Sequence, residues 1–143
     1  MIWIGIDTGR HTGFAAWDGR RLVAVRTVTI TQAMELVRGY MRQGPVRLRI
    51  EDARQRRWFG ATGRERLKGA GSVCRDATVW EDWCRENGVT AEFVAPERNR
   101  TKLSPEQFRT VTGYAGITSS HGRDAAMLVY KIYAGKPTTS VVG

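Results

Sequence analysis

The chain opens with Met1-Ile-Trp-Ile-Gly-Ile-Asp7-Thr-Gly9, in which isoleucines alternate with Trp3, Gly5 and Asp7. Because successive side chains of a strand point to opposite faces, this period of two predicts a strand over residues 2–7 with its isoleucines on one face. The strand ends in a carboxylate at the point where a turn begins. Asp is common at the start of turns, so Asp7 taken alone is equally well explained as a turn residue.

After this strand the sequence predicts two more strands and then an alternation of helices and strands. Residues 13–17 and 22–30 are predicted as the next two strands, because Asp18-Gly19 between them is typical of a tight hairpin. Cap residues, stop signals and apolar spacing predict the remaining elements. The first of these is a helix capped by Thr31 and stopped by Gly44-Pro45, followed by a strand over 46–51 that ends in Glu51. Next come a helix capped by Ser72 and closed by Asn87-Gly88 and a strand over 91–95. The last two are a short helix capped by Ser104 that ends near Gly113 and a helix capped by Ser120 and ended by Gly135.

This succession predicts the α/β class, with a five-stranded mixed sheet in the order β-β-β-α-β-α-β-α-α flanked by helices. The length of 143 residues indicates a single domain, which we place at residues 1–135, with a frayed tail over residues 136–143. Since a helix precedes it, the fourth strand can run parallel to the first. Asp7 and Glu51 then end two strands at the edge where ligands bind in open α/β sheets.

Basic residues outnumber acidic ones, with 23 Lys and Arg against 14 Asp and Glu, for a formal net charge of +9. Only four of the basic residues are Lys, so 19 are Arg, whose planar guanidinium suits phosphate. We therefore expect a polyanion as partner, with a solvated basic surface as the plain alternative. The segment from Ala53 to Gly71 is basic and contains glycine without clear periodicity, which predicts a mobile surface loop.

The two cysteines, Cys74 and Cys84, lie ten positions apart in one predicted helix, which separates them too far along its axis for a disulfide. The sequence lacks zinc-type Cys and His spacing, a signal peptide pattern and any run of about 18 apolar residues. We therefore expect a soluble, cytoplasmic protein in a reducing compartment, with no membrane partner.

Asp124 is the most informative acid, because it shares a helical stripe with Ala125, Leu128 and Ile132. That stripe should be buried, and a buried charge is costly without a partner. His121 lies one turn earlier on the same face. For His121 alone, a position near the start of a helix with no special role is the more frequent case.

If Asp7, Glu51 and Asp124 meet, their charges repel unless a cation lies between them. Hard oxygen ligands favour Mg²⁺ or Mn²⁺, and two such ions held about 4 Å apart hydrolyse phosphodiesters by activating water and stabilising the leaving oxygen. The alternative for Glu51 is a structural ion pair with Arg49 or Arg54.

Several short motifs together resemble the RuvC family of Holliday junction resolvases. They are Ile4-Gly-Ile-Asp7-Thr-Gly with Gly13-Phe-Ala, Ile50-Glu51, Val111-Thr-Gly113, and His121-Gly-Arg-Asp124-Ala-Ala, and they span nearly the whole chain. The resemblance implies a ribonuclease H-like fold and a homodimeric, Mg²⁺-dependent endonuclease, with two ions in each active site, that cuts branched DNA symmetrically. It places the catalytic and metal-binding residues at Asp7, Glu51, His121 and Asp124. The chain is somewhat shorter than the usual bacterial members, which suits a phage-type member.

The resemblance also implies that the basic segment after Glu51 contacts the junction, where Trp58 or Phe59 would stack on an unpaired base. The alternative is that these aromatics pin the loop to the core or to a dimer partner. The family's basic residues around Val111-Thr-Gly113 do not align cleanly. The residues expected to contact nucleic acid are Arg54, Arg56, Arg57, Trp58, Phe59, Arg64, Lys68, Arg100, Lys102 and Arg109.

Two other functions fit the same residues. The fold hosts several nucleases, so the substrate could be an RNA–DNA hybrid or a structured RNA. The chain could also be a nucleic-acid-binding module without turnover, in which the carboxylates are structural. We expect no nucleotide cofactor: Asp7-Thr-Gly9 and Thr12-Gly13 also resemble the first phosphate loop of actin-like and sugar-kinase ATPases, but those proteins need two such domains.

Overall fold

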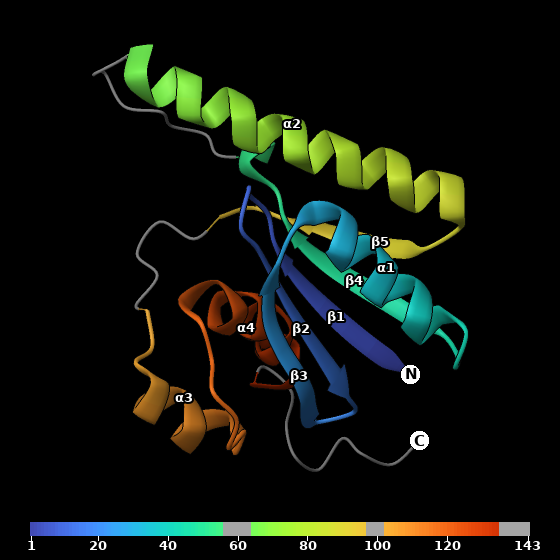
Figure 1. The fold of residues 1–143 in the computed structure, drawn as a ribbon, viewed down its shortest axis with the longest axis vertical. Coiled ribbons are helices and arrows are strands. Elements are labelled where there is room, and N and C mark those ends of the chain that lie inside the picture. The colour runs from blue at the N-terminus through green and yellow to red at the C-terminus, as the bar shows by residue number, and fades with distance from the viewer. Residues whose placement is uncertain (56–63, 97–101, 135–143) are drawn as a thin grey trace.

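The computed structural model describes residues 1–55, 64–96 and 102–134, of which 64–70, 72 and 73 are described by their backbone only (Figure 1). The order of the elements confirms the predicted α/β class and the predicted succession of strands and helices. The elements are β1 (Ile2–Asp7), β2 (Thr12–Asp18), β3 (Arg21–Val28), α1 (Ile30–Met41), β4 (Val46–Glu51), the 3₁₀ helix η1 (Ala53–Gln55), α2 (Arg64–Asn87), β5 (Thr90–Val94), α3 (Pro105–Thr112) and α4 (Ser120–Ala134).

The five strands form one mixed sheet in the spatial order β3-β2-β1-β4-β5. The first three strands are antiparallel neighbours, joined between β2 and β3 by the predicted turn, in which Gly19 has a φ of 60°. α1 carries the chain across to β4, which pairs parallel with β1 as predicted, and β5 pairs parallel with β4. The strand that ends in Asp7 is therefore central and has β2 on one side and β4 on the other.

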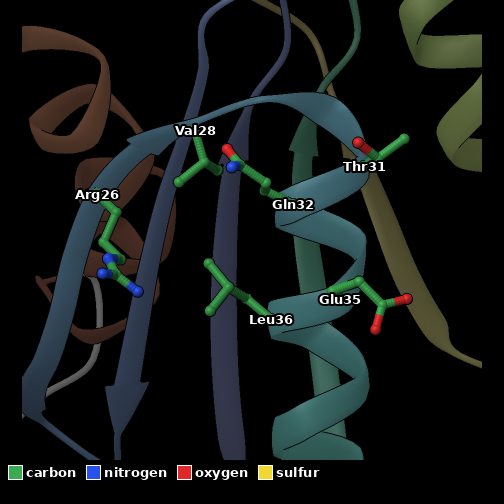
Figure 2. A pocket seen from close by; sticks show the side chains of 6 residues that line it. All are labelled: Arg26, Val28, Thr31, Gln32, Glu35 and Leu36. Carbon is green, nitrogen blue, oxygen red and sulfur yellow. The ribbon is translucent and has the colours of Figure 1, made fainter.

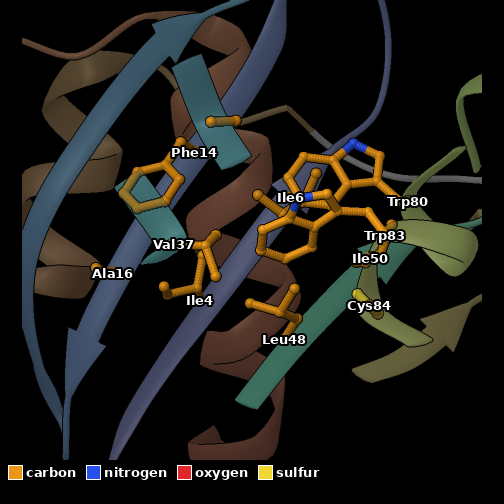
Figure 3. Packing of buried hydrophobic residues seen from close by; sticks show 11 residues of the cluster. Ile4, Ile6, Phe14, Ala16, Val37, Leu48, Ile50, Trp80, Trp83 and Cys84 are labelled. Atoms are coloured by element: carbon orange, nitrogen blue, oxygen red, sulfur yellow. The ribbon is translucent and has the colours of Figure 1, made fainter. Parts of the chain in front are cut away.

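One face of the sheet packs against α1 and α2 (Figures 1 and 3). The alternating residues Ile4 and Ile6 of β1, with Leu48 and Ile50 of β4, are fully buried there against Trp80 of α2. Full burial of one such aliphatic side chain contributes roughly 1.5–3 kcal/mol. The period of two in the sequence therefore fixes which face of β1 and β4 lies in this core.

The other face of the sheet packs against α4, and we call it the α4 face. A Cβ atom built on Gly5 would lie 1.9 Å from the carbonyl oxygen of Ala125, so the backbones of β1 and α4 approach as closely as glycine allows. The indole nitrogen of Trp17 donates a hydrogen bond of 3.1 Å to the carbonyl oxygen of Ala126. These contacts hold α4 directly against the two strands that lead to and from the Asp7 turn.

Two predicted helix caps are wrong by one or two residues. Thr29, not Thr31, caps α1, because Thr29 and Gln32 exchange side-chain and backbone hydrogen bonds in a capping box, and β3 ends at Val28. Ser119, not Ser120, caps α4: its hydroxyl accepts a hydrogen bond of 3.1 Å from the backbone nitrogen of Gly122. For α3 the predicted cap is confirmed, since Ser104 forms a capping box with Gln107.

The predicted start of α2 is also wrong. The helix begins at Arg64 rather than after Ser72, and residues 53–55 form a 3₁₀ turn, so the loop prediction is wrong for residues 53–55 and 64–71. Residues 56–63 of that predicted loop lie outside the described residues. Arg, Glu, Leu, Lys and Ala over residues 64–70 are strong helix formers, and they outweigh the glycines on which the loop prediction relied. The predicted C-terminal tail lies outside the described residues.

Cys74 and Cys84 are free thiols, as predicted. Among the helices in the described ranges, none is both long enough and apolar enough to cross a membrane.

Candidate active site at the ends of the central strands

Asp7 and Glu51 lie next to each other where β1 and β4 end. Ile6 pairs with Ile50 in the parallel register, so the following residues occupy neighbouring positions on strands about 4.8 Å apart. Ile6 and Ile50 are buried toward α1 and α2, and alternation therefore turns both carboxylates to the α4 face. The predicted juxtaposition of the two strand ends is confirmed.

The N-terminal turns of α4 bring His121 and Asp124 to the same end of the sheet. A Cβ on Gly13, the residue that pairs with Asp7, would lie 2.0 Å from the carbonyl oxygen of His121. The His121 Nδ1 atom is 3.3 Å from Asp7 Oδ2. Asp7 and Asp124 are each only 8% exposed, which confirms the predicted burial of Asp124. Two buried carboxylates within one site need compensating cations or donors.

Lys102 approaches Asp124 from the segment before α3, with its Nζ 3.8 Å from Asp124 Oδ2 and its side chain 70% exposed. Arg123 holds that segment in place: its Nε donates to the carbonyl oxygen of Leu103 at 3.0 Å, and its Nη1 donates to both Thr118 oxygens. Sequence reasoning did not single out Arg123, because its partners are backbone and hydroxyl oxygens in a loop, which carry no sequence pattern.

His11 and Thr8 are further residues of this site that the sequence analysis did not name. The ring of His11, in the turn after β1, stacks on the ring of His121 with 6.2 Å between centroids and an interplanar angle of 27°. The Thr8 hydroxyl donates a hydrogen bond of 3.1 Å to the carbonyl oxygen of Glu51, which ties the ends of β1 and β4 together. Their position in the turn directly after Asp7 was the available signal.

The four predicted catalytic residues occupy one region but do not form a closed ligand shell. Asp7 contacts His121 and adjoins Glu51 in the sheet, while Asp124 lies one turn further along α4. Within residues 1–55, 64–96 and 102–134, no three His, Cys, Asp or Glu side chains are grouped closely enough to hold a metal ion. The structure therefore brings the strand and helix ends that carry the four donor side chains together, but it does not gather those side chains around a single point.

The residues expected to contact nucleic acid fall into three groups. Lys102 and Arg109 are both exposed. Lys102 lies on the segment before α3 and contacts Asp124, and Arg109 lies on α3. Arg54 is engaged within the protein, by Asp52 and Glu81. The others lie outside the described residues, or in the first turns of α2 where only the backbone is described: Arg56, Arg57, Trp58, Phe59 and Arg100 in the former case, Arg64 and Lys68 in the latter.

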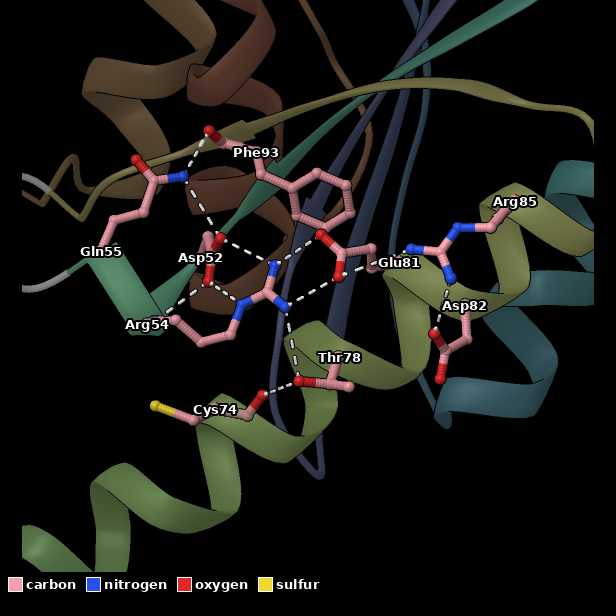
Figure 4. A network of polar contacts seen from close by, with 9 residues as sticks. All are labelled: Asp52, Arg54, Gln55, Cys74, Thr78, Glu81, Asp82, Arg85 and Phe93. Atoms are coloured by element: carbon pink, nitrogen blue, oxygen red, sulfur yellow. Dashed lines mark hydrogen bonds and ion pairs between the residues drawn. The ribbon is translucent and has the colours of Figure 1, made fainter.

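The structural ion pair considered for Glu51 involves other carboxylates in the structure. Arg49 pairs with Glu92 at 3.6 Å. Arg54 pairs with the buried Asp52 at 2.8 Å (Figure 4). Burial by itself raises the pKa of Asp52, but hydrogen bonds from Arg54 and Gln55 outweigh it and lower that pKa below its ordinary value. Within the described residues, Arg49 and Arg54 thus form ion pairs with Glu92, Asp52 and Glu81.

A hollow of about 440 Å³ lies between β3 and α1 (Figure 2). It opens on the opposite side of the sheet from α4. Its lining holds a single carboxylate, so it lacks the paired acids of the Asp7 end. The lining residues are Arg26, Val28, Thr31, Gln32, Glu35 and Leu36.

No protein-family model and no curated protein matches this chain. The function is therefore inferred from the geometry and chemistry of the chain itself.

Proposed function

We propose that this protein is a metal-dependent, structure-selective DNA endonuclease that resolves Holliday junctions and other branched DNA by paired phosphodiester hydrolysis. One observation carries the proposal: Asp7 and Glu51 end adjacent parallel strands on the face covered by α4, which adds the buried Asp124 at the same end. The net charge of +9 suits a polyanionic substrate.

The donor set suits Mg²⁺ or Mn²⁺. Asp7, Glu51 and Asp124 supply the hard carboxylate oxygens that these ions prefer, and His121 supplies a nitrogen. The burial of two of these carboxylates, at 8% exposure each, would cost less with a cation present. When bound, the metal would activate water and stabilise the leaving oxygen of the phosphodiester.

The protein's own side chains have separable tasks in this site. α4 covers the α4 face and keeps bulk water from most of the Asp7 and Asp124 carboxylates. His121, 3.3 Å from Asp7, orients that carboxylate. Lys102 offsets the charge of Asp124 and keeps most of its side chain in solvent, where a DNA phosphate can reach it.

We further infer a ribonuclease H-like fold and a homodimer. The first inference is supported by three antiparallel strands followed by a helix and a parallel strand, with acids at the ends of β1 and β4 and on the last helix. The second follows from the chemistry, because paired incisions need two active sites and a two-fold dimer is the commonest arrangement that supplies them. Such an enzyme would act in the cytoplasm of a bacterium or of a phage-infected cell.

Asp7→Asn tests the proposal. We expect the variant to bind a four-way junction as tightly as the parent and to cut it at least about 100-fold more slowly, since several kcal/mol of transition-state stabilisation depend on the metal site. Asp18→Asn is the matched control, because Asp18 is an exposed acid at the end of β2, at the opposite end of the sheet. Cleavage by Asp7→Asn at the parent's rate would contradict the proposal.

A further inference from the structure

The residue after Glu51 is held by an unusually complete set of hydrogen bonds. Asp52 is 3% exposed, and its carboxylate accepts bonds from Arg54 Nε at 2.8 Å, Arg54 Nη2 at 3.0 Å, the Arg54 backbone nitrogen at 3.0 Å and Gln55 Nε2 at 3.2 Å (Figure 4). Both carboxylate oxygens are thus satisfied by residues of η1. Because the hydrogen-bond acceptor positions of the Asp52 carboxylate are occupied and the side chain is buried, the rotamer of Asp52 is fixed.

Arg54 extends this arrangement to α2. Its Nη1 and Nη2 atoms each lie 3.2 Å from an oxygen of Glu81, and its guanidinium carbon lies 5.5 Å from the centre of the Phe93 ring on β5. Arg54 is therefore bidentate toward two carboxylates at once and stacks on an aromatic ring. The network of Asp52, Arg54 and Glu81 joins the end of β4 to α2 and to β5.

The same network meets the backbone of the candidate catalytic residue. Asp52 donates its backbone N–H to the carbonyl oxygen of Val94 at 2.8 Å, and the Glu51 carbonyl oxygen accepts from the Thr8 hydroxyl at 3.1 Å. The peptide between Glu51 and Asp52 is thus anchored on both sides. Because successive side chains at a strand end point to opposite faces, fixing Asp52 toward α2 fixes Glu51 toward the α4 face.

Stability alone does not explain this network. A buried ion pair is a weak source of stability, because apolar side chains of similar volume replace it at little or no cost. Its distinctive property is directional: a bidentate guanidinium holds a carboxylate in one orientation. A catalytic carboxylate needs its position fixed to within about 0.5 Å, and partners outside the first layer of ligands commonly supply that precision.

We propose that Asp52, held by Arg54 and Glu81, is a positioning residue that sets the orientation of the Glu51 carboxylate for phosphodiester hydrolysis. The inference rests on the proposed nuclease function. It gives Arg54 a task inside the protein in place of the DNA contact expected from its position in the basic segment.

The experiment measures single-turnover cleavage of a four-way DNA junction by the full chain, with enzyme in excess and Mg²⁺ varied. Asp52→Asn and Arg54→Lys are compared with Arg38→Gln, which removes an exposed ion pair on α1 at the opposite side of the sheet from α4. Each rate is divided by the folded fraction measured by circular dichroism, and junction affinity is measured without metal.

We expect Asp52→Asn to lower the maximal rate about 10- to 100-fold and to raise the Mg²⁺ concentration for half-maximal rate, with junction affinity unchanged, as for loss of a partner that orients a metal ligand. Arg54→Lys keeps the charge but loses the planar fork, so we expect it to show the same defect. Loss of a phosphate contact by Arg54 would instead weaken junction binding. Arg38→Gln should match the parent.

The double variant Glu51→Gln with Asp52→Asn separates positioning from general loss of structure. If Asp52 acts through Glu51, the second change should slow cleavage no further than Glu51→Gln alone. Multiplicative losses in the double variant, or parent-like kinetics for Asp52→Asn, would overturn the positioning role while the nuclease function stands. A parent protein that cuts no nucleic acid would overturn the proposed function and this inference with it.

Discussion

Replacing Gly13 by alanine should displace α4 from the sheet and disable the site. The added Cβ would lie 2.0 Å from the carbonyl oxygen of His121 and 3.0 Å from the Cβ of Asp7. Contact distances between unbonded heavy atoms are about 3.5 Å, so the α4 backbone must move by roughly 1 Å or more. We expect a loss of about 1–3 kcal/mol in the free energy of unfolding, as for overpacked cores. A 1 Å misplacement of catalytic groups lowers the rate by about 100-fold.

The matched control is Gly39→Ala on α1, where a Cβ would meet no atom within 4 Å. Alanine there should stabilise the helix by up to about 1 kcal/mol and leave cleavage unchanged. Urea unfolding followed by tryptophan fluorescence gives the stability of each variant, and junction cleavage gives the rate. A Gly13→Ala protein as stable and as active as the parent would refute the close packing of α4 over the end of β1.

Three further predictions test separate parts of the structure. Burial raises the pKa of the Cys84 thiol to about 11, so at pH 8 iodoacetamide should modify Cys84 at least about 10-fold more slowly than the partly exposed Cys74. Mass spectrometry should find the two rates equal in about 8 M urea, which unfolds most domains. Equal rates in the folded protein would contradict the burial of Cys84. The lowered pKa of Asp52 means that this carboxylate stabilises the fold above about pH 4 and loses that contribution as the pH falls. The difference in free energy of unfolding between the parent and Asp52→Asn should therefore shrink between about pH 6 and about pH 3, the range over which carboxyl groups titrate. A constant difference would argue against the buried ion pair. Lys102→Gln should weaken junction binding and reduce the slope of log affinity against log salt by about one, and an unchanged slope would show that Lys102 contacts no phosphate.

The strands could be predicted from the sequence because burial on one face leaves a local pattern. Alternation over residues 2–7 and 46–51 gave both central strands their observed bounds, and the intervening helix indicated their parallel pairing. The juxtaposition of Asp7 and Glu51 follows from these two facts. The burial of Asp124 followed in the same way, from its place on an apolar helical stripe.

Helix starts were less predictable, because neighbouring residues compete for the same role. Thr29 and Thr31 are both good caps, and only Thr29 has Gln32 at the spacing that completes a capping box. Around Ser72 the glycines indicated a loop, yet the surrounding helix formers extend α2 back to Arg64. Where local signals are of similar strength, tertiary packing decides which residue begins the helix, and a single sequence does not show that packing.

The polar partners around the site were the least predictable. His121 is 114 positions from Asp7, and its stacking on His11 depends on how closely α4 lies on the glycines of β1 and β2. Asp52 is absent from the predicted site, although a second acid directly after a strand that ends in an acid is a visible signal. Contacts of this kind depend on tertiary structure and leave no periodicity.

The most direct test incubates the purified protein with a labelled four-way DNA junction and Mg²⁺ or Mn²⁺, beside linear duplex, an RNA–DNA hybrid and the Asp124→Asn variant. We predict paired, symmetric nicks in the junction, none in linear duplex, and none with Asp124→Asn. Tight junction binding without cleavage in either metal would contradict the nuclease function and indicate a binding module. Preferential loss of the RNA strand of the hybrid would contradict the junction as substrate and indicate a ribonuclease.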